Sequence, residues 1–211
     1  MGDYLIRRVV VGVMETNCYI VQDRRTRDAF VIDPGGNLTM IQDALHRMNA
    51  RCRLILLTHG HFDHILAVED LRSNRIPVVI HEADAHSLTE RDMFSKLIPN
   101  DPRPFAPADY TLKREGKYTI NDMTFYMIPT PGHTKGSVCY LFDDNLFTGD
   151  TLFRNSVGTL DFGGDREDMA RSLKLLCRLP GDYTVYPGHE SPTMLSDEIR
   201  NNPFLQEYRR T

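Results

Sequence analysis

A cluster of metal-binding side-chain types lies in 57-LTHGHFDHI-65. The protein has 8 histidines in 211 residues, and three of them fall within this short stretch together with an aspartate. Neutral imidazoles and carboxylates bind divalent metal ions, and a bound cation would offset the cost of crowding these groups at one bend. The pattern H-x-H-x-D-H therefore marks four candidate ligands: His59, His61, Asp63 and His64. For this motif alone, a hydrogen-bonded polar turn is the alternative.

Three later residues of the same types weaken that alternative. His133 lies in 131-PGHTKGS-137, Asp150 in 147-FTGDTLF-153 and His189 in 186-YPGHE-190. Each follows a glycine at the end of an apolar, strand-like run, and glycine permits the tight turn that would aim the next side chain away from a sheet edge. With the cluster, they give five histidines and two aspartates at predicted strand ends.

The elements that must position these residues alternate between strand-like and helix-like runs. The segment 52–58 is continuously apolar and stops at the cluster, after which Ile65, Val68 and Leu71 recur at helical spacing. The cluster is thus expected between the end of a strand and the start of a helix, where layered α/β folds often carry their chemistry. We expect further strands at 5–13, 17–22, 28–33, 77–81, 117–121, 123–129, 137–142, 145–148 and 183–186, and helices at 39–48, 167–178 and the C-terminus. Two strand-rich halves with interspersed helices favour stacked sheets covered by helices.

Other candidate ligands are set aside. His46 lies off the apolar face of the predicted helix 39–48, and His81 and His86 are expected to cap or decorate a strand–helix junction. The four cysteines (Cys18, Cys52, Cys139 and Cys177) are widely spaced among apolar neighbours, which indicates buried thiols.

Composition narrows the class of protein. The formal net charge is −4 and no basic stripe is visible, which argues against nucleic acid as a partner. The densest basic spot, Arg24 to Arg27, is expected to be an exposed hairpin tip. No apolar run is long enough for a membrane span, and no signal peptide is recognised, so we expect a cytoplasmic protein without a membrane partner. We expect one domain over 1–211, with the proline-rich 99–109 as a rigid surface excursion.

The chain resembles the metallo-β-lactamase-fold hydrolases, and among them the small glyoxalase II-like proteins. The resemblance runs from 17-NCYIV-21 and 32-IDPGG-36 through the histidine cluster to 186-YPGHE-190 and 202-NPFL-205. It implies an αββα sandwich of the α/β (α+β) class, with two metal ions at the edge of the sheets. By position, His59, His61 and His133 would hold one metal. Asp63, His64 and His189 would hold the other, Asp150 would bridge them, and Asp33 would support the site.

The implied function is metal-dependent hydrolysis of a small-molecule substrate. Two metal ions can lower the pKa of a shared water, and Asp63 would orient this nucleophile as well as bind metal. A thioester such as S-lactoylglutathione suits such a site, because a thiolate of pKa about 8.5 can leave without a strong general acid. Nitrogen and oxygen ligands favour zinc, with iron or manganese as alternatives.

Two departures from the family pattern bear on the substrate. Thr159 stands where arginine is usual, and Lys135 occupies a position where proline is usual. The larger glutathione-binding helical domain of full-length glyoxalase II is also expected to be largely missing. Lys135 and Arg154 are the candidate contacts for an anionic substrate.

Other functions on the same fold remain as alternatives. A mononuclear iron persulfide dioxygenase is the first. A lactonase, a phosphodiesterase and a metal-binding protein without turnover are less favoured. A β-lactamase is also less favoured, since that resemblance usually goes with secretion and with a cysteine ligand or no aspartate at the bridging position.

Overall fold

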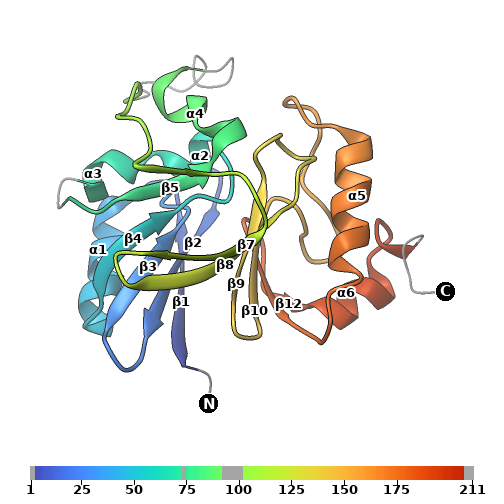
Figure 1. Ribbon diagram of the computed structural model, residues 1–211, viewed down its shortest axis with the longest axis horizontal. Coiled ribbons are helices and arrows are strands. Elements are labelled where there is room, and N and C mark those ends of the chain that lie inside the picture. The colour runs from blue at the N-terminus through green and yellow to red at the C-terminus, as the bar shows by residue number, and fades with distance from the viewer. Residues whose placement is uncertain (1–2, 73–74, 92–101, 207–211) are drawn as a thin grey trace.

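Two six-stranded sheets pack face to face in the computed structural model, which describes residues 3–72, 75–91 and 102–206 (Figure 1). The first sheet has the order β1-β2-β3-β4-β5-β6 and the second β12-β11-β10-β9-β8-β7. The strands of the first sheet are β1 (Tyr4–Val11), β2 (Thr16–Asp23), β3 (Asp28–Ile32), β4 (Arg51–Leu56), β5 (Val78–His81) and β6 (Tyr110–Leu112). Those of the second are β7 (Gly116–Ile120), β8 (Met123–Pro129), β9 (Val138–Phe142), β10 (Asn145–Gly149), β11 (Thr184–Pro187) and β12 (Thr193–Met194).

Helices cover the outer faces of both sheets. In the first half of the chain they are α1 (Leu38–Met48), α2 (Phe62–Ile65), α3 (Val68–Arg72) and α4 (His86–Thr89), and in the second α5 (Arg166–Leu176) and α6 (Leu195–Asn201). Figure 1 shows α1 and α3 outside the first sheet and α5 and α6 outside the second. The predicted αββα sandwich is confirmed.

Alternating side chains of the inner strands build the layers. In β3, Ala29 and Val31 join the core beneath α1 and α3, whereas Phe30 and Ile32 join the core between the sheets. A strand buried on both faces is apolar on both faces, and residues 29–32 of β3 are all apolar and buried. A third core, which contains Leu173 of α5, lies on the outer face of the second sheet.

Parallel pairing brings several strand ends to the same edge. β3, β4, β5 and β6 pair in parallel in the first sheet, and β10 and β11 pair in parallel in the second. Because the carboxyl ends of parallel strands lie together, the loops that follow β4, β10 and β11 meet at this edge.

The prediction for the proline-rich segment 99–109 is wrong in part. Its first three residues lie outside the described residues. Beyond them the chain has no helix or strand up to Asp109, as expected, but Arg103 and Phe105 are only 1% and 7% exposed. The Phe105 N–H donates to the Leu88 carbonyl oxygen at 2.8 Å, which holds this segment against α4 rather than on the surface.

Two further findings concern the shortest strands and the helices. The short edge strands β6 and β12 were not predicted, because strands of two or three residues leave little periodicity to read. None of the described helices is both long and apolar enough to cross a membrane.

Candidate metal centre

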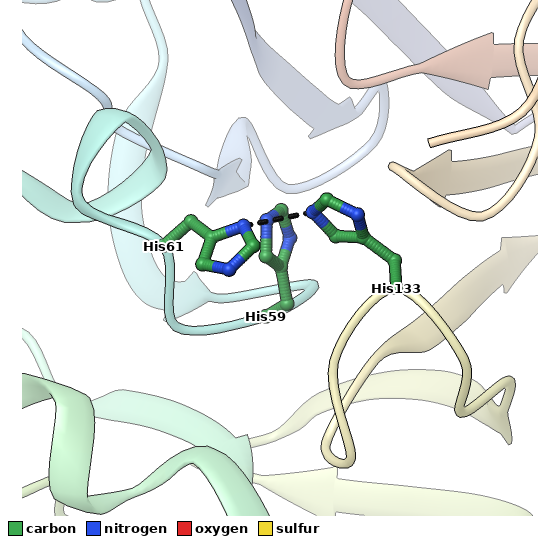
Figure 2. A group of neighbouring side chains, drawn as sticks. All are labelled: His59, His61 and His133. Atoms are coloured by element: carbon green, nitrogen blue, oxygen red, sulfur yellow. Dashed lines mark hydrogen bonds between the residues drawn. The ribbon is translucent and has the colours of Figure 1, made fainter. Parts of the chain in front are cut away.

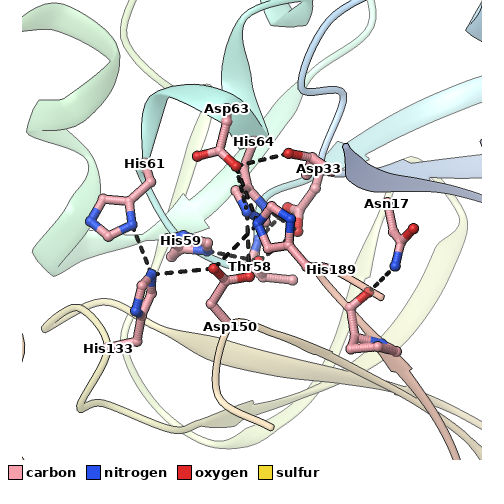
Figure 3. A network of polar contacts seen from close by, with 12 residues as sticks. Asn17, Asp33, Thr58, His59, His61, Asp63, His64, His133, Asp150 and His189 are labelled. Atoms are coloured by element: carbon pink, nitrogen blue, oxygen red, sulfur yellow. Dashed lines mark hydrogen bonds and ion pairs between the residues drawn. The ribbon is translucent and has the colours of Figure 1, made fainter. Parts of the chain in front are cut away.

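All seven predicted ligands converge where the two sheets meet (Figure 3). Each side chain is placed by the end of a strand or by the helix that follows it. His59 and His61 lie on the loop after β4, and Asp63 and His64 lie on α2. The other three follow β8, β10 and β11 and are His133, Asp150 and His189.

One group consists of three histidines (Figure 2). The ring centroid of His59 lies 4.8 Å from that of His61 and 4.8 Å from that of His133. The His133 Nε2 and His61 Nδ1 atoms are 2.8 Å apart. The three rings therefore present nitrogen atoms to one point.

A second group consists of Asp63, His64 and His189. The Asp63 Oδ2 atom lies 3.4 Å from His64 Nε2 and 3.3 Å from His189 Nε2. Asp150 lies between the two groups, since its Oδ1 is 3.4 Å from His64 Nε2 while its Oδ2 is 3.5 Å from both His133 Nε2 and His189 Nε2. A single carboxylate thus reaches side chains of both groups.

Three buried atoms at this point lack hydrogen bonds to any described residue: His59 Nε2, His64 Nε2 and Asp150 Oδ1. A buried polar atom without a partner costs about 1–3 kcal/mol. Divalent cations would satisfy all three atoms, and five imidazoles with two carboxylates form a donor set that suits zinc, iron or manganese. The residues therefore fit metal ions.

Burial keeps two of the imidazoles neutral, the form that binds metal. It lowers the pKa of His59 well below the usual value, and the other histidines lower it further. Burial likewise lowers the pKa of His133 to about 3. These pKa shifts favour free lone pairs at neutral pH.

The charged members of the site perturb one another. Burial alone would lower the pKa of His64, but the carboxylates of Asp63, Asp150 and Asp33 outweigh it and raise this pKa to about 10. Burial raises the pKa of Asp150 to about 6. Burial also acts to raise the pKa of Asp63, yet His64 and several hydrogen bonds leave it below its usual value.

Hydrogen bonds orient the histidines toward the centre. Asp33 accepts from His64 Nδ1 at 2.9 Å and from the Thr58 hydroxyl at 2.6 Å. The Thr58 oxygen in turn lies 3.1 Å from His59 Nδ1, so that ring donates to it. His133 Nδ1 donates to the Thr159 carbonyl oxygen at 2.7 Å. Using each Nδ1 in this way leaves the opposite Nε2 for the site.

His189 and Asp63 are held by a different segment, the residues around the start of β2. His189 Nδ1 donates to the Met14 carbonyl oxygen at 3.1 Å, and the Thr16 hydroxyl donates to Asp63 Oδ2 at 2.8 Å. The close approach of β10 and β11 also requires Gly188, because a Cβ atom there would lie 2.1 Å from Asp150 Oδ1.

Sequence reasoning missed Thr16 and Thr58. Both could have been identified from the sequence, since Thr58 adjoins the histidine cluster and Thr16 adjoins the 17-NCYIV-21 segment. The Thr159 contribution could not be foreseen, because it is made by a backbone carbonyl group.

The histidines that were set aside lie outside the metal-binding groups among the described residues. His46 and His86 are exposed. His81 Nδ1 accepts from the Ala83 N–H at 3.2 Å, which is the capping role expected of it.

A cavity of about 430 Å³ opens beside the three-histidine group. His61 forms part of its wall, and Phe162, Ser87 and His86 add an aromatic ring, a hydroxyl and an imidazole. Lys135, one of the two candidate substrate residues, also lines it. Arg154 is exposed but is not part of this lining.

Comparison with known proteins agrees with this arrangement. The sequence profile of the Metallo-beta-lactamase superfamily matches residues 11–189. The "Probable polyketide biosynthesis zinc-dependent hydrolase BaeB" of Bacillus velezensis (strain DSM 23117 / BGSC 10A6 / LMG 26770 / FZB42) is 33% identical, over 90% of this chain and 81% of its own.

Two solved structures are similar over almost the whole chain. BLEG-1, described as a B3 metallo-beta-lactamase, has a TM-score of 0.87 at 36% identity and covers 95% of this chain and 99% of its own. TTHA1623, solved in a di-iron-bound form, has a TM-score of 0.79 at 34% identity and covers 94% of this chain and 100% of its own. The fold, the profile match and the convergent histidine and aspartate residues lead to one conclusion: this chain belongs to the metallo-β-lactamase superfamily and is a metal-dependent hydrolase.

Proposed function

We propose that the protein is a glyoxalase II-like thioesterase, which splits an acyl thioester with water at a centre for two metal ions. The observation that carries the proposal is the position of Asp150, whose two oxygens lie within 3.5 Å of His64, His133 and His189. A carboxylate so placed supports a bridging role between the two groups. His59, His61 and His133 would hold one ion, and Asp63, His64 and His189 the other.

The bound ions would lower the pKa of a water molecule and polarise the substrate carbonyl group. The protein's own residues would position the reactants. The Thr16 hydroxyl fixes one oxygen of Asp63, and this carboxylate would accept a hydrogen bond from the attacking water and orient it. The water loses a proton to solvent as its oxygen adds to the acyl carbon, the carbon–sulfur bond breaks, and the sulfur leaves as a thiolate. The thiolate then takes up a proton from solvent, so the products are a carboxylic acid and a thiol.

The cavity beside His61 supports a place for the rest of the substrate. We propose that an extended thioester lies along Phe162 and that an anionic group of it meets Lys135. S-Lactoylglutathione is one substrate of this class. Lys135 is the better placed of the two candidates, since Arg154 does not line the cavity.

A β-lactamase is the second candidate, and the likeness to BLEG-1 favours it. The sequence comparison with BaeB favours zinc, whereas the likeness to TTHA1623 favours iron. One set of assays distinguishes these candidates.

The test is a panel of substrates on protein of measured metal content. We expect two metal ions per chain and hydrolysis of glutathione or coenzyme A thioesters. Hydrolysis of a β-lactam without thioester cleavage would replace this function with the second candidate. One iron per chain with oxygen uptake on glutathione persulfide would replace it with a dioxygenase.

A further inference from the structure

A buried carboxylate lies just outside the metal centre. Asp84 follows β5 in a short 3-10 turn, is 4% exposed, and is not one of the proposed ligands. Its Oδ2 accepts from the Gly60 N–H at 2.9 Å and from the Thr134 hydroxyl at 2.7 Å. Its Oδ1 accepts from the Gly136 N–H at 2.8 Å. All three donors are on loops that carry metal-site histidines.

Two of these donors, Gly60 and Thr134, lie next to the histidines in the sequence. Gly60 separates His59 from His61, and Thr134 directly follows His133. One carboxylate therefore joins the two backbone segments that bring the three histidines together, although these segments are more than 70 residues apart in the sequence.

Both loops pack closely against the turn that bears Asp84. A Cβ atom on Gly60 would lie 2.4 Å from Ser87 Oγ, and one on Gly136 would lie 2.5 Å from Asp84 Cγ. Such distances leave no room for a side chain at either position. The glycines thus permit the short hydrogen bonds that the carboxylate makes.

We propose that Asp84 is a positioning residue that sets the spacing of His133 from His59 and His61, and thereby the metal affinity of this group. In the described part of the chain, its hydrogen bonds do not reach Asp63, His64 or His189. The effect of Asp84 is therefore confined to one of the two groups. This inference rests on metal binding by the three histidines and does not depend on the substrate.

Asp84→Asn is an informative variant, because an amide cannot replace both carboxylate oxygens. Whichever way the amide is turned, its NH2 group faces the N–H of Gly60 or of Gly136. One loop therefore loses its acceptor. The conservative variant Thr134→Val removes the hydroxyl, which donates to Asp84 and also contacts Ser137 Oγ at 2.8 Å, and should act in the same direction more weakly.

The experiment measures cobalt(II) binding to each group separately. His189→Ala leaves the three-histidine group intact, and His133→Ala leaves the other group intact. Asp84→Asn is added to each, and affinity is measured from the cobalt(II) absorption bands in competition with a chelator. We expect Asp84→Asn to weaken binding by about 10- to 100-fold in the His189→Ala protein and by less than about threefold in the His133→Ala protein.

Glu198 offers a matched control for lost stability. It is also a buried carboxylate, 2% exposed, with three donors: the Asn155 N–H, the Thr193 hydroxyl and the Asn202 amide. These contacts are made by α6 and its neighbours, and none of them is with one of the seven proposed ligands. Glu198→Gln should lower the unfolding temperature much as Asp84→Asn does, while cobalt affinity stays unchanged.

Three outcomes would overturn the inference. They are unchanged affinity in Asp84→Asn, equal losses at both groups, and a loss in Glu198→Gln as large as in Asp84→Asn. Failure of the wild-type protein to bind metal at the three histidines would overturn this inference and the proposed centre together. If the wild type binds two ions but splits no thioester, only the proposed function fails.

Discussion

The proposed two-ion arrangement depends on the side chain of Asp150. Because it contacts members of both groups, Asp150→Ala should reduce the metal content from two ions per chain to one or fewer. Thioesterase activity should fall with it, by about 10²–10³-fold or more. Metal analysis and steady-state kinetics on the same preparation check this, and full activity with one or no ion would contradict it.

Substitution of Lys135 tests whether the cavity binds an anionic group of the substrate. Lys135→Ala should raise KM for anionic thioesters about tenfold, with kcat nearly unchanged, because the lysine lines the cavity without contacting the reacting atoms. Lys135→Arg should restore much of the loss. Arg154→Ala is the matched control and should leave KM unchanged. An equal rise in KM for anionic and neutral thioesters would show that the charge of Lys135 is not the reason.

His64 makes metal binding dependent on pH. Its pKa in the metal-free protein is raised to about 10 by the surrounding carboxylates, which outweigh the effect of burial, so the ring carries a proton at neutral pH. A metal ion at Nε2 must displace that proton. Affinity should therefore fall as pH falls, by about tenfold per unit between pH 7 and 9. Calorimetry in buffers of different ionisation enthalpy should detect the released proton, and a flat profile would contradict the assignment.

At the scale of strands and helices, the pattern of side chains predicted most of what was found. Strand β3 was predicted from the strand-like residues of 28–33, and each of its buried positions carries an apolar residue, whichever core it enters. The predicted strands 117–121 and 123–129 form the hairpin of β7 and β8, in which Asn121 and Asp122 both adopt the positive φ that such tight turns need.

What escaped prediction depends on contacts between distant parts of the chain. Neither the burial of Arg103 nor the role of Asp84 can be read from periodicity, because each follows from a partner in another element. The predicted ligands, by contrast, were identified from local patterns: H-x-H-x-D-H for four of them, and a preceding glycine at the end of a strand-like run for His133, Asp150 and His189. Such patterns can be recognised in the sequence, whereas nothing in the local sequence distinguishes a supporting carboxylate such as Asp84 from any other aspartate.

The hydrophobic core between the two sheets holds the two halves of the molecule together. Phe30 is 1% exposed and packs against Phe142, with ring centroids 4.7 Å apart, and against Phe125 at 6.0 Å. Phe30→Ala should lower the free energy of unfolding by about 3–5 kcal/mol. Met40→Ala, on the exposed side of α1, should change it by less than about 0.5 kcal/mol. Denaturant unfolding of both variants measures the difference.

At the scale of the whole molecule, the proposed metal centre would link the two sheets, and its ions should stabilise the fold as well as support the chemistry. The proposed ligands come from α2 and the loop after β4 on one side and from the loops after β8, β10 and β11 on the other. Each ion that binds the folded chain at 100 times its dissociation constant would add about 2.7 kcal/mol, so two ions would add about 5.4 kcal/mol. For a chain of this length, removing both should lower the unfolding temperature by about 10–20 °C.

Thermal unfolding before and after chelation measures this shift, and adding the metal back should reverse it. Variants that keep only one group of proposed ligands show which group produces the shift in unfolding temperature. His189→Ala and His133→Ala should each retain part of the metal-dependent shift, because each keeps one group, whereas Asp150→Ala should lose most of it. An unfolding temperature that does not respond to metal would mean that the two sheets hold the seven side chains in place unaided, and that the ions contribute to chemistry alone.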